Sequence, residues 1–370
     1  MSTVYRVGII GCGSISHLHM KGYLGEERFE VVALSDPVAE ARKDFGDRYD
    51  IGKRYADARE MLDEEGLDVV SICTWHKLHA PLTIAACARG PKAILCEKPM
   101  AVNMGECDEM MIAARRNDVK LAIAHQRRFN PVWTDARNLI AEGAIGDVRH
   151  VHCSGSQGLL NDCSHMFDFM RYVMSDPAPE WVIGNIERKT DRYERDIRIE
   201  DRSAGIVGFD NGAVGQLLQE LHPERRQGGY LYGTDGMMDV NEQRVLLINS
   251  KTGGWEERPS TGEDPSVGQA VELADWIEGK SEHRGEASNG RAAVEIIMGI
   301  YESARLHEVV QMPVRTHSSP IEEMIEAGDL PVERPGRYDI RAFLLRGESM
   351  QGETPDEMQS EQPGVADEEG

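Results

Sequence analysis

Several polar side chains in the stretch LNDCSHMFD, residues 160–168, have a spacing that could support acid–base chemistry. His165 follows Asn161 by four residues and precedes Asp168 by three, so on a helix the three side chains would share neighbouring parts of one face. A histidine oriented by such a partner can exchange protons near neutral pH. Taken alone, the stretch also fits a core histidine, which is the commoner case.

A second candidate is Lys98, which follows the apolar run KAILC (92–96) in the segment AILCEKPM. Ligands of open parallel sheets bind outside the carboxyl ends of the strands. Hydride transfer needs a proton-transfer partner for the substrate hydroxyl, and a partly desolvated lysine has a lowered pKa that suits this task. The alternative is a surface charge beside Glu97.

The segment VGIIGCGSIS places Gly11-x-Gly13-x-x-Ser16 between a predicted strand and a predicted helix. In this context the first glycine makes a tight turn and the second lets the backbone approach a pyrophosphate. Asp36 follows twenty residues after Ser16, where a carboxylate accepts from ribose hydroxyls and repels a 2′-phosphate. The pattern therefore predicts NAD as the cofactor. NADP is the less favoured alternative, because Arg42 lies close enough along the next helix to bind a 2′-phosphate.

The elements that must position these residues alternate over the first 125 residues. Short runs rich in Val, Ile and Leu predict strands at 5–10, 30–35, 67–73, 92–96 and 119–124. Their continuous apolar character is typical of strands covered on both faces, and amphipathic stretches lie between them. This rhythm predicts an α/β domain with a doubly wound parallel sheet.

After about residue 150 the pattern changes. The run SAGIVGFDNGAVGQLLQEL has two strand-like halves around Asp210–Asn211–Gly212, which favours a hairpin. Further short strands and two helical stretches follow, so we expect an α+β domain with a largely antiparallel open sheet and flanking helices.

The totals limit the protein class. The 370 residues suit two domains, and the net charge of −23 argues against nucleic acid as a partner. No apolar run approaches the ~20 residues that span a membrane. The seven cysteines are odd in number and include no CxxC pair, which favours a reducing, cytoplasmic location.

Paired histidines occur at His17-x-His19, His76-x-x-His79 and His150-x-His152. None of the pairs has a third ligand at the spacing that zinc sites require. We therefore predict no metal site.

The chain resembles the Gfo/Idh/MocA oxidoreductases, which include inositol and glucose dehydrogenases and glucose–fructose oxidoreductase. The resemblance spans residues 5 to about 315 and rests on GIIGCGSISHLH, SICTWHKLHAPLTIAACARG, ILCEKPM, HQRRFNPVW, NDCSHMFDFMRYV and IYESARLHEVVQMPV, in family order. It implies an N-terminal Rossmann domain, an active site between two domains, and an open sheet that often builds the oligomer interface. It also suggests a cis peptide before Pro99.

The resemblance assigns roles to individual residues. Lys98 matches the catalytic lysine, and His165 matches the histidine that is the usual acid/base. Arg127 and Arg128 match an arginine pair, one of which commonly reaches the substrate. Thr74 and His79 match a segment beside the nicotinamide, TPNxxH in relatives, although here Trp75 and His76 replace its Pro and Asn. The predicted cofactor-binding residues are Gly11, Gly13, Ser14, Ile15, Ser16, Asp36, Thr74, His79, Glu97 and Lys98.

The partner of His165 remains open. Inositol-dehydrogenase-like relatives have an aspartate four residues before the histidine, where this chain has Asn161, as in members that act on nucleotide-linked sugars. Its amide oxygen can fix the tautomer of His165 but supplies no charge. Asp162 is predicted to bind substrate. It is one residue further along, which on a helix is about 100° of rotation away from the position of the aspartate. Asp162 could therefore replace the aspartate as the partner of His165 only if the helix begins late.

We therefore expect an NAD(P)-dependent oxidoreductase acting on a secondary alcohol of a sugar, cyclitol or sugar derivative. The alternatives are an enzyme with tightly bound NAD that hydrolyses or epimerises glycosides by transient oxidation, and a non-catalytic nucleotide- or sugar-binding protein. We expect no membrane partner and a homodimer or homotetramer formed through the C-terminal sheet. The expected parts are a cofactor domain (1–125), a substrate and oligomerisation domain (126–316), a C-terminal arm (317–348) and an acidic, disordered tail (349–370).

Overall fold

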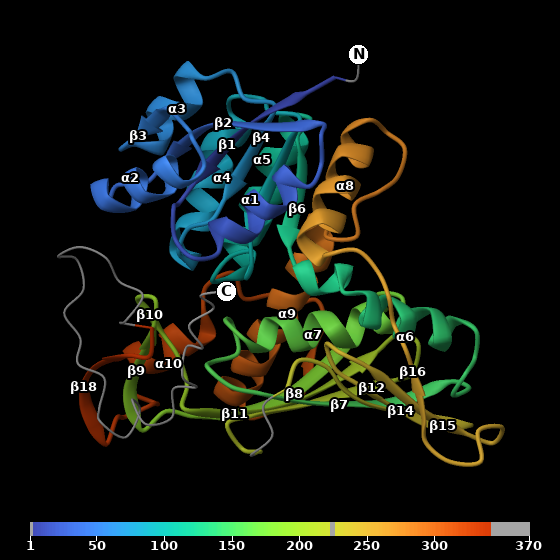
Figure 1. Cartoon of the computed structure of the whole chain (residues 1–370). Coiled ribbons are helices and arrows are strands. Elements are labelled where there is room, and N and C mark those ends of the chain that lie inside the picture. Colours follow the sequence, from blue (N-terminus) through green and yellow to red (C-terminus); the bar gives the residue numbers. More distant parts are fainter. Residues whose placement is uncertain (1–2, 223–225, 342–370) are drawn as a thin grey trace.

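Six parallel strands from the first third of the chain form one sheet in the order β3-β2-β1-β4-β5-β6 (Figure 1). The computed structural model describes residues 3–222 and 226–341, so the expected tail and the end of the arm lie outside the described residues. The strands of this sheet are β1 (Tyr5–Ile10), β2 (Phe29–Ser35), β3 (Lys53–Tyr55), β4 (Val69–Ile72), β5 (Ala93–Glu97) and β6 (Lys120–Ala124).

Helices connect successive strands of this sheet. They are α1 (Ser16–Leu24), α2 (Ala39–Arg48), α3 (Ala58–Glu64), α4 (His79–Cys87) and α5 (Met104–Arg116), with the short 3-10 helix η1 (His76–Leu78) before α4. Every residue of β4 and β5 is buried, which explains their continuous apolar sequence. The strand order reverses between β1 and β4, and such a switch point opens a crevice for a ligand.

Nine strands form a second sheet in the order β16-β15-β14-β13-β7-β12-β11-β8-β17. Only the β7–β12 pair is parallel. The strands are β7 (Val148–Gly155), β8 (Pro179–Glu187), β11 (Arg202–Phe209), β12 (Val214–Gln219), β13 (Gly229–Gly233), β14 (Gly236–Val240), β15 (Val245–Asn249), β16 (Glu256–Arg258) and β17 (Val310–Gln311). The predicted fold class, a doubly wound parallel sheet followed by a largely antiparallel open sheet with helices, is confirmed.

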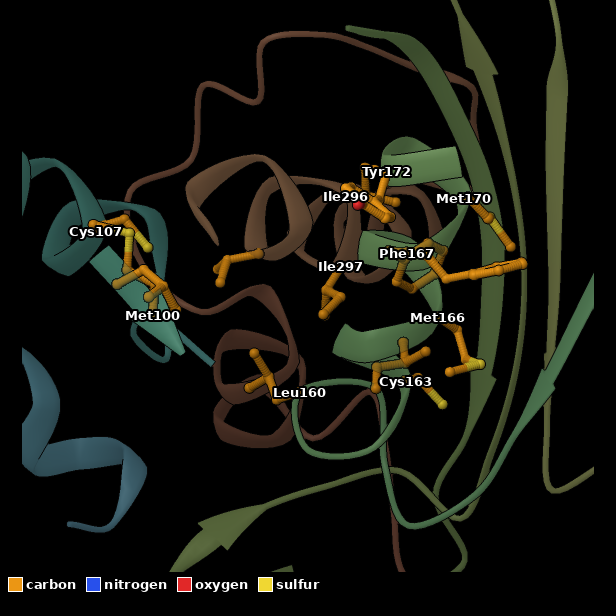
Figure 2. Packing of buried hydrophobic residues seen from close by; sticks show 14 of the residues in the cluster. Met100, Cys107, Leu160, Cys163, Met166, Phe167, Met170, Tyr172, Ile296 and Ile297 are labelled. Carbon is orange, nitrogen blue, oxygen red and sulfur yellow. The ribbon is translucent and has the colours of Figure 1, made fainter. Parts of the chain in front are cut away.

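Helices cover the face of the second sheet that is turned toward the first domain (Figure 1). They are α6 (Pro131–Ala141), α7 (Cys163–Val173) and α9 (Ala287–Leu306), and the 3-10 helix η2 (Gln126–Phe129) leads into α6. All residues of α7 are buried. Figure 2 shows Met166 and Met170 on the side of α7 that faces the sheet, with Phe167 nearer Ile297 of α9. The helix that carries His165 is thus held from all sides.

One helix of the C-terminal half packs on the first domain. Helix α8 (Pro265–Ile277) lies against α1 (Figure 1), and Lys21 Nζ of α1 lies 2.8 Å from Asp264 Oδ2 at the start of α8. Gly22 of α1 allows the close approach, because a Cβ there would lie 2.5 Å from the Ser266 carbonyl oxygen. The two domains are therefore connected at two places: by the chain itself at η2, and by the packing of α8 on α1.

The C-terminal arm adds a third, three-stranded sheet. Helix α10 (Pro320–Ala327) is followed by β18 (Arg334–Asp339), which pairs in parallel with β9 (Thr190–Glu194), and β9 pairs with β10 (Ile197–Arg198). The described part of the arm thus packs on the second domain of its own chain. Across the described residues, no helix has both the length and the apolar character that crossing a membrane requires.

The α1–α8 contact predicts a stability effect. Gly22→Ala would force a Cβ against the backbone of Ser266, so we expect the free energy of unfolding to fall by about 1–3 kcal/mol. The measurement is chemical denaturation of both variants. Gly52→Ala is the control, since a Cβ there meets nothing within 4 Å, and its effect should stay within about 0.5 kcal/mol. Equal stability of the two variants would contradict tight packing at Gly22.

Candidate active site

The loop after β1 is shaped for a phosphate group. Gly11 has φ +95°, and a Cβ there would lie 2.5 Å from the Cys73 carbonyl oxygen. A Cβ at Gly13 would meet nothing within 4 Å, so the backbone there is open to a ligand. The N-terminus of α1 follows, with Ile15 at the cap making no side-chain hydrogen bond and with no acidic residue in the first turn. The open backbone at Gly13 and the dipole of the helix that follows fit a pyrophosphate.

Asp36 lies at the end of β2, beside this loop. Its two carboxylate oxygens accept from the amides of Cys12 and Val38, each at 2.8 Å, so the side chain is fixed. The Arg42 guanidinium donates to the carbonyl oxygens of Asp36 (2.5 Å) and Pro37 (3.0 Å) instead of standing free for a phosphate. A fixed carboxylate at this position fits the ribose of NAD and disfavours NADP.

Lys98 follows β5 and reaches across to the second domain. Its Nζ donates to the Asn161 carbonyl oxygen at 2.9 Å and to Asn161 Oδ1 at 3.2 Å. Burial lowers the pKa of Lys98 to about 8. The Lys98–Pro99 peptide is cis, as predicted.

Glu97, the residue before Lys98, is buried behind the site. Its Oε1 accepts from His19 Nε2 at 3.0 Å, and its Oε2 accepts from the Lys98 amide at 3.1 Å. The carboxylate therefore stabilises the strand end that carries Lys98 and contributes a negative charge beside it.

Asn161 does not lie on the helix of His165. Helix α7 begins at Cys163, so the one-face arrangement expected from the spacing is not formed at this end. The Asn161 Oδ1 atom accepts from Lys98 and from Arg195 Nη1 at 3.3 Å, while its Nδ2 is buried and has no hydrogen-bond partner in the part of the chain that the structure describes. Asn161 thus orients Lys98 rather than His165.

His165 is 3% exposed, and its Nδ1 has no hydrogen-bond partner among the described residues. The ring of His125, which follows β6, stands edge-on to it with centroids 5.8 Å apart. Burial lowers the pKa of His165 well below its ordinary value, and the nearby charges of Arg127 and Lys98 act in the same direction. The imidazole is therefore neutral at physiological pH and can accept a proton.

The two neighbouring arginines differ in their surroundings. Arg127 Nε pairs with Glu242 Oε1 at 3.0 Å, and its side chain is 21% exposed. Arg128 is fully buried and pairs with Asp168 at 2.7 Å and Asp176 at 2.8 Å. Asp168 therefore serves Arg128 and not His165, and Arg128 has its donors occupied inside the protein.

Three further predicted residues lie around the same strand ends. The ring nitrogens of His79 lie 2.7 Å from the Pro99 carbonyl oxygen and 3.0 Å from that of Thr74, so His79 ties together the segments that follow β4 and β5. Thr74 Oγ1 is buried, and within residues 3–222 and 226–341 it has no hydrogen-bond partner. Asp162 Oδ1 accepts from Gln227 Nε2 at 2.8 Å.

The sequence reasoning missed three residues of this region. His125 directly follows β6, and its place at a strand end was an available signal. Glu194 and Arg195 come from the β9–β10 hairpin; Glu194 is buried against His76, with 3.3 Å between Oε2 and Nδ1. Nothing in the local sequence marks that hairpin as part of the site. Among the described residues, no group of three His, Cys, Asp or Glu side chains could hold a metal.

A glycine loop after β1, a fixed carboxylate after β2 and a lysine after β5 lie at strand ends of one parallel sheet, an arrangement typical of oxidoreductases that use a dinucleotide. Residues 5–125 match the family described as "Oxidoreductase family, NAD-binding Rossmann fold". The chain is 31% identical over 268 residues to the "Uncharacterized oxidoreductase YrbE" of Bacillus subtilis (strain 168), covering 66% of this chain and 76% of that protein. It therefore belongs to the Gfo/Idh/MocA family of NAD-binding oxidoreductases, which confirms the predicted family and cofactor.

Two further proteins are similar to this chain. The myo-inositol 2-dehydrogenase of Thermotoga maritima is 26% identical over 270 residues, covering 66% of this chain and 79% of that protein. A levoglucosan dehydrogenase solved with NADH and levoglucosan superposes with a TM-score of 0.76 at 20% identity, covering 84% of this chain and all of that one. The second likeness shows that the fold is shared.

The arginine pair yields a stability prediction. Arg128→Met would leave Asp168 buried without its cation, so the free energy of unfolding should fall by about 3–5 kcal/mol. Arg127→Met breaks a partly exposed pair and should cost no more than about 1 kcal/mol. Chemical denaturation of both variants tests this difference. An Arg128→Met protein as stable as wild type would mean that the buried pair contributes little.

Proposed function

We propose that this chain is an NAD-dependent dehydrogenase that transfers a hydride between a secondary alcohol of a sugar, cyclitol or sugar derivative and the nicotinamide ring. The observation that carries the proposal is Lys98 Nζ held against Asn161 near His165, at the strand ends that the glycine loop and Asp36 also flank. The names of the similar proteins, an inositol dehydrogenase and a levoglucosan dehydrogenase, support a polyhydroxylated ring as substrate.

Lys98 and His165 would have different roles in alcohol oxidation because their charges differ. Lys98 has two of its three ammonium donors directed at Asn161, which leaves one for the substrate oxygen. His165 is buried and neutral, so it can take the hydroxyl proton. NAD, when bound, supplies the acceptor for the hydride that leaves the same carbon.

Backbone and side-chain groups on the chain would hold the cofactor. The open backbone at Gly13, between β1 and α1, would bind the pyrophosphate, and Asp36 would bind the adenosine ribose. Thr74 Oγ1, a buried hydroxyl without a partner, is available toward the nicotinamide side. Arg127 and Asp162 would contact the substrate from the second domain. Arg128 would instead stabilise α7, because its guanidinium is buried in ion pairs with Asp168 and Asp176.

The proposal includes a homo-oligomer formed through the open face of the second sheet. That face, opposite α7 and α9, carries apolar side chains that are 36–41% exposed, namely Ile183, Ile206 and Tyr232. Exposed apolar residues on adjacent strands favour a protein partner, here a second copy, as a dimer or tetramer. The seven cysteines are all free and buried, which supports a cytoplasmic location.

The first test is Lys98→Met. Removing the ammonium should lower kcat by at least about 100-fold and leave NAD affinity nearly unchanged, because the phosphate loop and Asp36 are untouched. NADH formation from a panel of sugars and cyclitols measures turnover, and fluorescence titration measures NAD binding. Lys92→Met is the matched control, since Lys92 lies at the opposite end of β5 and pairs with Asp68 at the surface. Full turnover by Lys98→Met would refute the proposed role.

The pKa of Lys98 predicts the pH dependence. Its charged form is the hydrogen-bond donor, so kcat/KM for alcohol oxidation should fall as the pH rises through about 8. Protonation of His165 should not limit activity near neutral pH, since burial holds its pKa well below the ordinary value. A rate that instead rises through about pH 8 would show that neutral Lys98 acts as the base.

A further inference from the structure

The C-terminal arm contacts the hairpin that projects toward the catalytic lysine. Strand β18 pairs with β9, and the β9–β10 turn consists of Arg195 and Asp196 (Figure 1). This sheet lies at one side of the second domain, below the carboxyl ends of the first sheet. The arm therefore reaches the neighbourhood of Lys98 through residues more than 140 positions later than the hairpin.

The turn has a conformation that its residues disfavour. Arg195 has φ 47° and Asp196 has φ 66°, values that two-residue hairpin turns usually reach with Asn or Gly. Asp339 of β18 compensates, because its Oδ1 accepts from the Arg195 amide at 3.2 Å and its Oδ2 from the Asp196 amide at 3.1 Å. Asp339 is 1% exposed, so these hydrogen bonds are shielded from water.

The turn directs the Arg195 side chain at the site. Its Nη1 donates to Glu194 Oε1 at 2.8 Å and to Asn161 Oδ1 at 3.3 Å. Asn161 Oδ1 also accepts from Lys98 Nζ at 3.2 Å. With these two distances of 3.2 and 3.3 Å to one oxygen, the two cationic nitrogens are at most 6.5 Å apart.

The arm makes a second contact with the same region. Arg341, just after β18, donates through Nη2 to Gln157 Oε1. Gln157 belongs to the loop that leads from β7 to Asn161. The arm thus holds both the hairpin and the loop whose residues meet at the Asn161 side chain.

We propose that the C-terminal arm completes the active site: Asp339 fixes the hairpin, and Arg195 is a positioning residue that fixes the Asn161 amide and, through it, Lys98. The proposal rests on the proposed function for the importance of Lys98. Two donors on Asn161 Oδ1 define which way the amide points, since a reversed amide would turn its own NH2 toward both cations.

The arrangement also affects the charge of Lys98. Burial is the main reason that its pKa is low; Glu97 raises the pKa and Arg195 lowers it. The titratable and charged groups that face Lys98 from the surrounding elements are Glu97, His76, His125, Asp162, His165, Glu194 and Arg195. Removing the guanidinium should therefore make the ammonium form more stable and raise the pH at which Lys98 titrates.

The test measures Lys98 itself. Competitive acetylation with trace acetic anhydride over a pH series, read for the Lys98 peptide by mass spectrometry, gives the titration midpoint of its amine. In Arg195→Gln the midpoint should rise by about half to one pH unit, the effect expected for a charge at this distance in a partly screened site. Arg195→Lys retains the cation and should restore most of the wild-type midpoint.

A matched pair of variants tests the arm. Asp339→Ala removes the two acceptors of the turn and should raise the midpoint in the same direction as Arg195→Gln. Asp201→Ala is its control, since Asp201 accepts from the amides of Lys189 and Thr190 at the far end of β9. The control should leave the midpoint unchanged while removing a comparable number of hydrogen bonds.

The outcomes separate the two proposals. A wild-type midpoint in both Arg195→Gln and Asp339→Ala would overturn the role of the arm, whatever the activity. An equal shift in Asp201→Ala would also overturn it, because the effect would then be general loosening. If the predicted shifts occur but Lys98→Met retains full turnover, the arm does position Lys98 and the proposed function fails instead.

Discussion

The hydrogen bonds from Lys98 Nζ to the carbonyl and side-chain oxygens of Asn161 are the interaction on which the site depends. A partly buried ammonium is costly unless acceptors replace its lost water. Both acceptors come from one residue of the second domain, while the lysine comes from the end of a strand in the first. Lys98 therefore meets both acceptors only when the two domains are docked, and the α1–α8 contact and the crossover at η2 hold the domains together at two separate places.

The buried ion pairs of Arg128 support this geometry from behind. Arg128 belongs to η2, at the crossover between the domains, and its partner Asp168 lies on α7, one turn beyond His165. Because both side chains are almost fully buried, a movement of α7 that separated them would leave an unpaired charge inside the protein, so the pair holds α7 against the crossover. His165 and Lys98 are thus positioned by separate contacts that meet at the same junction.

Several features could be predicted from sequence because they are local. The glycine loop, Asp36 and Lys98 each follow a continuous apolar strand, and parallel strands bring their carboxyl ends to one edge. The partner of Asn161 was harder to predict, because it depends on where α7 begins. The helix begins at Cys163, two residues after Asn161, so the Asn161 side chain contacts Lys98 instead of His165. Arg128 matched a family motif, but only tertiary packing shows that its donors are already occupied.

Arg195 could not be found from the sequence at all, because its conformation is stabilised by a residue 144 positions away. Hydrogen bonds over such separations leave no periodicity or spacing in the chain. The same is true of the described part of the arm, whose contact with the hairpin depends on the pairing of β18 with β9. Such contacts are visible only once the two segments are placed side by side in the structure.

The pKa of Lys98 results from effects of opposite sign. Burial and Arg195 lower its pKa, and Glu97 raises it. Burial raises the pKa of the Glu97 carboxyl, but the hydrogen bond from His19 together with the charges of His19, Lys98 and His79 lowers it below its ordinary value. If His19 donates through Nε2, its Nδ1 can accept from Ser71 Oγ at 3.1 Å, and Ser71 Oγ in turn can accept from Tyr23 OH at 2.6 Å. In this arrangement each donor from Tyr23 to Glu97 has an acceptor, so the carboxylate that raises the pKa of Lys98 is itself held in place by hydrogen bonds.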